Sequence, residues 1–163
     1  MRCPSPCVAR MAERIATITL DEGSIIHRSA EVEHERSVAI ADLLHENLFQ
    51  PLCMTDGPYE VQLRIEEGRL IFDITGATRQ KGKVALSVQP LRGVIRDYFL
   101  ICESYYEALK AVSPGKIEAI DMGRRGVHNE GSEILQTMLK DRVKVDFPTS
   151  RRLFTLICVL HIK

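Results

Sequence analysis

The 163-residue chain contains no tryptophan, and aromatic residues make up only 6% of it. It also has no net charge, because 22 Lys and Arg balance 22 Asp and Glu. Proteins that bind nucleic acids usually have a basic excess, since phosphate contacts dominate their affinity, so a nucleic-acid partner is disfavoured. With 45% hydrophobic and 27% charged residues, the composition is that of a globular protein. It excludes intrinsic disorder, collagen and coiled-coil rods.

Long apolar segments are absent as well. The longest apolar run, LFTLICVLHI at 153–162, is about half as long as a membrane-spanning helix needs to be. The Pro-, Cys- and Arg-containing N-terminus has no apolar segment of the kind that targeting signals carry. We therefore expect no membrane association. We also expect a disordered tail or mis-assigned start at 1–10, followed by one globular domain over 11–163.

The motifs of several common sites are missing. None of the five cysteines (Cys3, Cys7, Cys53, Cys102 and Cys158) forms a CxxC pair. There is no HExxH or DxDxDG metal motif, no GxSxG nucleophile motif and no GxxxxGK[ST] phosphate loop. These absences predict no metal and no cofactor, and the odd number of unpaired cysteines predicts a reducing, cytoplasmic location.

Charge is distributed unevenly along the chain. Residues 21–60 carry a charge of −7, whereas residues 61–163 carry +5. We expect these regions to attract each other within one fold. The basic segment with Arg79, Lys81 and Lys83 could contact RNA, but no aromatic residue interleaves it, so nucleic acid is an unlikely partner.

The periodicity of apolar residues changes along the chain. Period-two alternation predicts strands at 14–20 and 83–89 and a hairpin at 59–76. Helical periodicity predicts helices at 29–49, from Pro90 to about 112, at 116–140 and at 149–162. This order predicts an α+β fold: an antiparallel sheet of about four strands, one helix between strands 1 and 2, and three C-terminal helices packed on the sheet. In the helix after Pro90 one apolar stripe is expected, made of Val94, Tyr98, Cys102, Tyr105, Leu109 and Val112.

The predicted helix 116–140 contains charged residues where apolar ones are expected. Arg124 lies in the apolar stripe, and Asp121 and His128 lie on its border. Because an unpaired buried guanidinium is costly, two interpretations remain open. Arg124 could form an internal ion pair with Asp121 or with an acid of helix 29–49. Alternatively, an anion site for phosphate or carboxylate could be formed by Arg124, Arg125, His128 and Asn129.

Other residues could support such a site. Glu33 and Arg36 flank the apolar stripe of helix 29–49 and could form a network with Arg124. Tyr105 would need a hydrogen-bond partner if it were buried. The glycines at 123, 126 and 131 would allow close approach of another helix or a ligand, although glycine weakens a helix. By contrast, the Arg151–Arg152 pair is expected to be solvated.

Four segments of the sequence, VEHERSVAIADLL, RDYFLICESYYEA, IEAIDMGRRGVHNEG and RRLFTLIC, resemble uncharacterised protein family 0262. The resemblance extends from about Arg14 to the C-terminus. Members typically begin near Met11, in agreement with the predicted tail. The resemblance implies an alphaproteobacterial source and a single-domain, cytoplasmic protein, and it implies no activity, substrate or catalytic residue.

Two functions follow as expectations. The first is a soluble, non-enzymatic binding or regulatory module whose Arg124/His128 region binds a small anionic ligand or a protein partner. The second is a small enzyme that acts on a phosphorylated or carboxylated metabolite, with His128 as general acid/base and Arg124 and Arg125 holding the anion. The oligomeric state is left open.

Overall fold

A computed structural model describes residues 12–21, 29–111 and 114–161, so the predicted tail at 1–10 lies outside the described residues. The strands are β1 (Ile15–Leu20), β2 (Phe49–Pro51), β3 (Tyr59–Glu66), β4 (Arg69–Thr75), β5 (Lys81–Ser87) and β6 (Val143–Val145). The helices are α2 (Ala30–His45), α3 (Gln89–Ala111), α4 (Pro114–Leu139) and α5 (Phe147–Leu160). The α+β class predicted from the sequence is confirmed.

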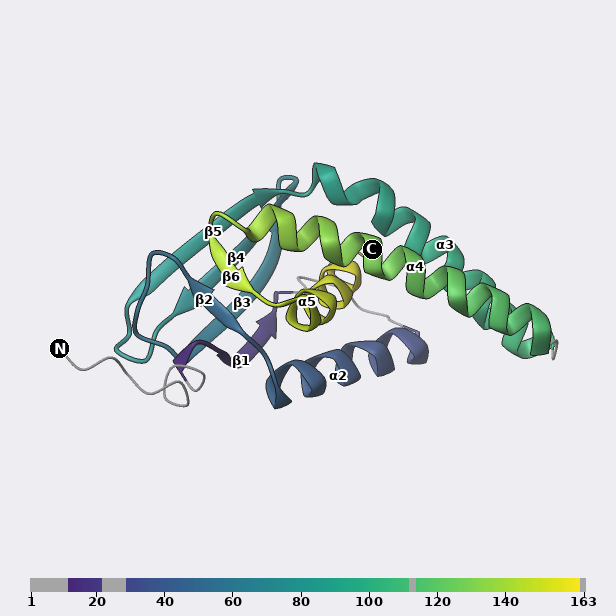
Figure 1. The fold of residues 1–163 in the computed structure, drawn as a ribbon, viewed down its shortest axis with the longest axis horizontal. Coiled ribbons are helices and arrows are strands. Elements are labelled where there is room, and N and C mark those ends of the chain that lie inside the picture. The colour runs from purple at the N-terminus through teal and green to yellow at the C-terminus, as the bar shows by residue number, and fades with distance from the viewer. Residues whose placement is uncertain (1–11, 22–28, 112–113, 162–163) are drawn as a thin grey trace.

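The main sheet has four strands in the order β1-β3-β4-β5 (Figure 1). The pairs β3–β4 and β4–β5 are antiparallel, as predicted, whereas β1 and β3 are parallel. The parallel pair arises because the chain crosses through α2 between the two strands and so enters β3 in the direction of β1. The sheet is therefore mixed rather than purely antiparallel.

The alternating apolar residues of the meander lie on one buried face. Leu63 pairs with Phe72, and Phe72 pairs in turn with Val84, so the three side chains form a row across the sheet. All three are at most 2% exposed. The predicted turn at Glu67-Gly68 has positive φ at both residues, which is the backbone of the tight turns that match strand twist.

Helix α2 is shorter than the predicted helix 29–49. It begins after Ser29, whose side chain accepts a hydrogen bond from the Val32 backbone, and it ends at His45. The prediction was wrong at the C-terminal end because the Asn47 side chain bonds the backbone of β1, donating to Ile15 O (3.1 Å) and accepting from Ile15 N (2.8 Å). The chain then forms β2, which pairs with β6 in a second, two-stranded sheet that the sequence analysis missed.

The helices pack around α5, which contacts β3 and lies between α2 and α4 (Figure 1). The apolar residues of α5 are buried, among them Leu153, Phe154, Leu156 and Ile157. Helices α3 and α4 form a hairpin that projects beyond the sheet (Figure 1).

The projection of this hairpin explains an error in the predicted core. Of the stripe expected on α3, Val94, Tyr98 and Cys102 are buried, but Leu109 near the projecting end is 45% exposed. Val112 lies outside the described residues. The inward-facing side of α3 has no sheet opposite it at that end. None of the described helices is long and apolar enough to cross a membrane.

Candidate functional site

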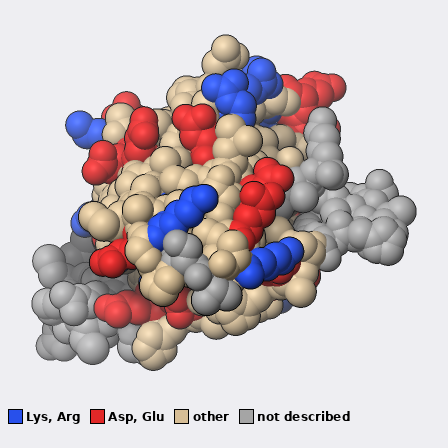
Figure 2. Space-filling view, turned by 90° about the vertical axis from the view of Figure 1, so that its right-hand side faces the viewer, with Lys and Arg blue, Asp and Glu red and all other residues tan. Residues whose placement is uncertain are grey.

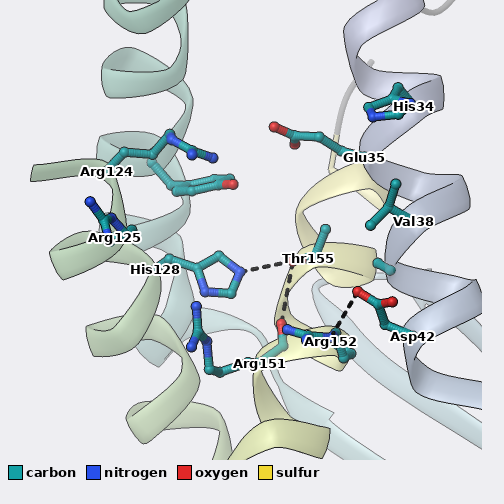
Figure 3. A pocket seen from close by; sticks show the side chains of 12 residues that line it. His34, Glu35, Val38, Asp42, Arg124, Arg125, His128, Arg151, Arg152 and Thr155 are labelled. Atoms are coloured by element: carbon teal, nitrogen blue, oxygen red, sulfur yellow. Dashed lines mark hydrogen bonds and ion pairs between the residues drawn. The ribbon is translucent and has the colours of Figure 1, made fainter. Parts of the chain in front are cut away.

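A pocket of about 310 Å³ lies where α2, α4 and α5 meet, and Tyr98 of α3 contributes to its wall (Figure 3). Helix α2 lines one side and α4 the other, and the first turns of α5 lie between them. The lining residues are His34, Glu35, Val38, Ala39, Asp42, Tyr98, Arg124, Arg125, His128, Arg151, Arg152 and Thr155. Three of the four residues predicted to bind an anion, Arg124, Arg125 and His128, are therefore brought together.

Close packing of α4 on α5 positions the imidazole of His128. At Gly131 a Cβ atom would overlap the ring of Phe154, so only glycine permits this approach. Phe154 in turn packs edge-on to His128, with the ring centroids 5.2 Å apart, and Tyr98 lies 5.4 Å from the same imidazole. Two aromatic rings thus hold the imidazole at the pocket wall.

His128 is only 9% exposed. Its Nε2 atom lies 2.8 Å from Thr155 Oγ1, whereas its buried Nδ1 atom has no hydrogen-bond partner among the described residues. Burial lowers the pKa of His128 to about 4, and the positive charges of Arg151, Arg124 and Arg152 act in the same direction. The imidazole is therefore neutral at pH 7.

Arg124 has two partners on its own hairpin. Its Nη2 atom donates to Asp121 Oδ1 (2.7 Å), and its guanidinium lies 4.8 Å from the centre of the Tyr105 ring. The hydrogen bond from Arg124 keeps the pKa of Asp121 below its usual value. Arg125 also pairs with Asp121 (Nη2–Oδ2, 3.0 Å), and its side chain is 61% exposed at the rim. The internal ion pair is thus present, and both arginines still line the pocket.

Arg151 and Arg152 are half-buried, so the expectation of a solvated pair was wrong. They lie in α5 soon after its N-cap, Asp146, where the opposite side of the helix is buried in the core. Arg152 Nε is 3.6 Å from Asp42 Oδ2. Arg151 Nε is buried and has no hydrogen-bond partner among the described residues.

Helix α2 supplies the acidic wall. Glu35 points towards Arg124 across the pocket (Figure 3) and accepts a hydrogen bond from the Tyr106 hydroxyl (2.8 Å). Four guanidinium groups face the carboxylates of Glu35 and Asp42, and Asp121 adds a third negative charge beside them. One positive charge remains in excess, so the pocket suits an anion.

Several predicted residues do not line the pocket. Asn129 is on α4 outside the lining, and its buried Oδ1 atom has no partner among the described residues. Glu33 and Arg36 lie on α2 but are also outside the lining, and their proposed network with Arg124 stays a prediction.

Thr155 and Glu35 were not predicted from the sequence, and Arg151 and Arg152 were expected to be solvated rather than part of a site. Two adjacent arginines at the start of an otherwise apolar helix were the available signal. Their importance became visible only when the structure placed α5 between α2 and α4.

Other sites are less developed in the described part of the chain. No group of three or more His, Cys, Asp or Glu side chains there could hold a metal ion. Cys53, Cys102 and Cys158 are free thiols. On the face that Figure 2 shows, basic and acidic side chains are interspersed with uncharged surface and form no single basic field.

The family model and the similar proteins found by comparison all name the same family. The model of Uncharacterised protein family (UPF0262) matches residues 12–163. A UPF0262 protein of Azorhizobium caulinodans is 54% identical over 156 residues, covering 92% of this chain and 94% of its own. One from Brucella abortus is 56% identical (91% and 93% covered), and one from Caulobacter vibrioides is 54% identical (94% and 96% covered). No solved structure matches. The chain therefore belongs to the uncharacterised family UPF0262.

Proposed function

We propose that this protein is a cytoplasmic, single-domain binding module whose pocket between α2, α4 and α5 takes a small anion. The observation that carries the proposal is the convergence of four arginines on a half-enclosed pocket that contains too few carboxylates to neutralise them. Guanidinium groups bind phosphate and carboxylate well because their donors match the geometry of these anions.

The buried Nε donor of Arg151, which has no acceptor in the described part of the chain, supports the same proposal. A buried N–H group without a partner costs free energy, and a bound anion would supply the missing acceptor. The cost is tolerated where it serves a function. Arg151 and Arg124 are therefore the residues we expect to contribute most to anion binding, with Arg152 and the rim residue Arg125 contributing less.

Binding is favoured over acid–base catalysis, the second function expected from the sequence. A general base works best when its pKa lies near the working pH. The pKa of about 4 makes neutral His128 a weak base and leaves almost none of it protonated to act as an acid. We therefore assign His128 to recognition of the ligand.

Isothermal titration calorimetry with inorganic phosphate at constant ionic strength tests this proposal. We expect saturable binding to the wild-type protein and an affinity about tenfold or more weaker for Arg151→Ala and Arg124→Ala, because each removes a charge-assisted hydrogen bond. The matched control is Arg64→Ala, which removes a similarly half-buried arginine from the sheet. Equal loss in all three variants, or no binding to the wild type, would contradict the proposal.

A further inference from the structure

Two residues that line the pocket, His128 and Arg151, each have a buried polar atom without a partner among the described residues. Arg151 Nε carries a hydrogen and can only donate, whereas His128 Nδ1 is either a donor or an acceptor, depending on where the imidazole proton lies. The guanidinium of Arg151 lies directly beside the His128 ring (Figure 3). The chemical character of Nδ1 therefore determines which ligand atom fits between them.

Thr155 fixes that character. Its hydroxyl donates to the carbonyl oxygen of Arg151 (3.3 Å), one helical turn earlier in α5 (Figure 3). A hydroxyl has a single hydrogen, so Thr155 Oγ1 must accept from His128 Nε2 at 2.8 Å. A neutral imidazole carries only one N–H group, which is then at Nε2. Nδ1 is consequently an acceptor with a free lone pair, on the imidazole ring beside the Arg151 guanidinium (Figure 3).

We propose that the ligand is a monoanionic phosphoryl group that still carries a proton, as in dihydrogen phosphate or the monoanion of a phosphate monoester. Its P–OH oxygen would accept from Arg151 Nε–H and donate to His128 Nδ1, which satisfies both unpartnered atoms at once. This inference rests on the proposed function and specifies the class of anion. A monoanion also matches the single excess positive charge of the pocket.

Anions without a proton fit less well. Sulfate and a phosphodiester offer only acceptor oxygens at neutral pH, so one of their oxygens would lie against the lone pair of Nδ1. A buried site that forms a hydrogen bond to a ligand O–H rejects analogues that lack the hydrogen. The low pKa of His128 strengthens this selection, because the imidazole does not readily take up a proton to become a donor.

The inference also predicts how affinity depends on pH. The charged and titratable groups around His128 are His34, Glu35 and Asp42 of α2, Tyr98 of α3, Asp121, Arg124 and Arg125 of α4, and Arg151 and Arg152 of α5. Phosphate monoesters lose their second proton with a pKa of about 6. Well above that pH the monoanion fraction falls about tenfold per pH unit, and the affinity should fall with it.

Calorimetry at constant ionic strength with inorganic phosphate, methyl phosphate, sulfate and dimethyl phosphate tests the inference. At pH 6.5 we expect the affinity for phosphate to be at least about tenfold higher than the affinity for sulfate or for dimethyl phosphate. Raising the pH to 8.5 should weaken the binding of methyl phosphate by about tenfold or more, because its dianion has no proton left to donate, and should leave sulfate binding unchanged.

Two variants test the proton arrangement itself. Thr155→Val keeps the shape of the side chain but removes the acceptor that holds the proton at Nε2. The imidazole can then carry its proton at Nδ1, so sulfate affinity should rise towards that of phosphate. His128→Phe keeps an aromatic ring between Tyr98 and Phe154 and removes both nitrogens, so the preference for phosphate should disappear.

The outcomes separate the two proposals. If phosphate and sulfate bind the wild-type protein equally and Arg151→Ala weakens both, this inference is wrong and the proposed function stands. If no anion binds the wild type, both are wrong. A preference for phosphate that survives in folded Thr155→Val and His128→Phe, as judged by circular dichroism, would also overturn the inference.

Discussion

Two half-buried arginines, Arg64 on the sheet and Arg124 in the pocket, differ in how many carboxylates compensate their positive charge. Their side chains are similarly exposed, at 22% and 27%. Arg64 contacts two carboxylates: it pairs with Glu66, and it donates through Nε to Asp73 Oδ2 (2.8 Å). Arg124, in contrast, shares the single carboxylate of Asp121 with Arg125.

The difference separates a structural ion pair from a candidate binding site. On the sheet the positive charge of Arg64 is compensated by two carboxylates at close range. In the pocket the arginines outnumber the carboxylates, and Arg151 Nε and His128 Nδ1 are buried without partners among the described residues. An uncompensated cluster in a chain of zero net charge is a local feature that folding alone does not require.

Acidification should test this contrast most strongly, because it would add another positive charge to the pocket. The pKa of His128 is 6.5 when it is unperturbed and about 4 in the fold. Between these values the unfolded chain binds a proton that the folded chain does not, so stability falls as the pH drops from about 6.5 to about 4. The full effect is about 3 kcal/mol, measurable by urea unfolding at several pH values.

The matched variant for this prediction is His128→Phe. Titration of carboxylates elsewhere affects both proteins, so the difference between their pH profiles isolates His128. We expect a shallower loss of stability in the variant over this pH range. Parallel profiles would show that His128 titrates normally and is not enclosed by the arginines.

Two glycines of α4, Gly131 at the contact with α5 and Gly126 on the open side, should respond differently to replacement by alanine. Gly131→Ala places a Cβ atom on the ring of Phe154 and should destabilise the fold by about 1–3 kcal/mol. Gly126 has no atom within 4 Å of the added Cβ, so Gly126→Ala should stabilise by up to about 1 kcal/mol through helix propensity. Thermal unfolding of both variants measures this, and equal effects would contradict the packing described for His128.

The smallest expected effect compares the arginines themselves. Arg64→Ala leaves Asp73 without its ion pair and should destabilise by about 0.5–1 kcal/mol. Arg151→Ala removes part of the excess charge and one unpartnered donor, so it should be neutral or slightly stabilising in the absence of ligand. Urea unfolding at low ionic strength makes the comparison, and greater destabilisation by Arg151→Ala would show that this arginine is structural.

Much of the fold follows from local patterns. The alternation at Leu63, Phe72 and Val84 predicts the buried face of the sheet, and the observed register places these residues together. The parallel pairing of β1 with β3 does not follow, because periodicity gives the faces of a strand and not its neighbours. The three-residue strands β2 and β6 are too short to produce a pattern.

The candidate site could likewise be predicted only in part from local patterns. Helical spacing correctly places Arg124 and His128 away from bulk solvent, because neither residue lies on the polar side of α4. It does not show which helix they meet. Arg151 and Glu35 became candidates only through the tertiary arrangement of α5 and α2, which no pattern within one helix encodes.

Nuclear magnetic resonance of the histidine ring nitrogens, in protein labelled with ¹⁵N-histidine, tests anion binding in the pocket most directly. The His128 signal is identified by its loss in His128→Phe. On titration with inorganic phosphate at pH 6.5, we expect the Nδ1 resonance of His128 to shift saturably while that of His161, which lies outside the pocket, does not move. A His128 spectrum that stays unchanged at saturating phosphate would contradict the account.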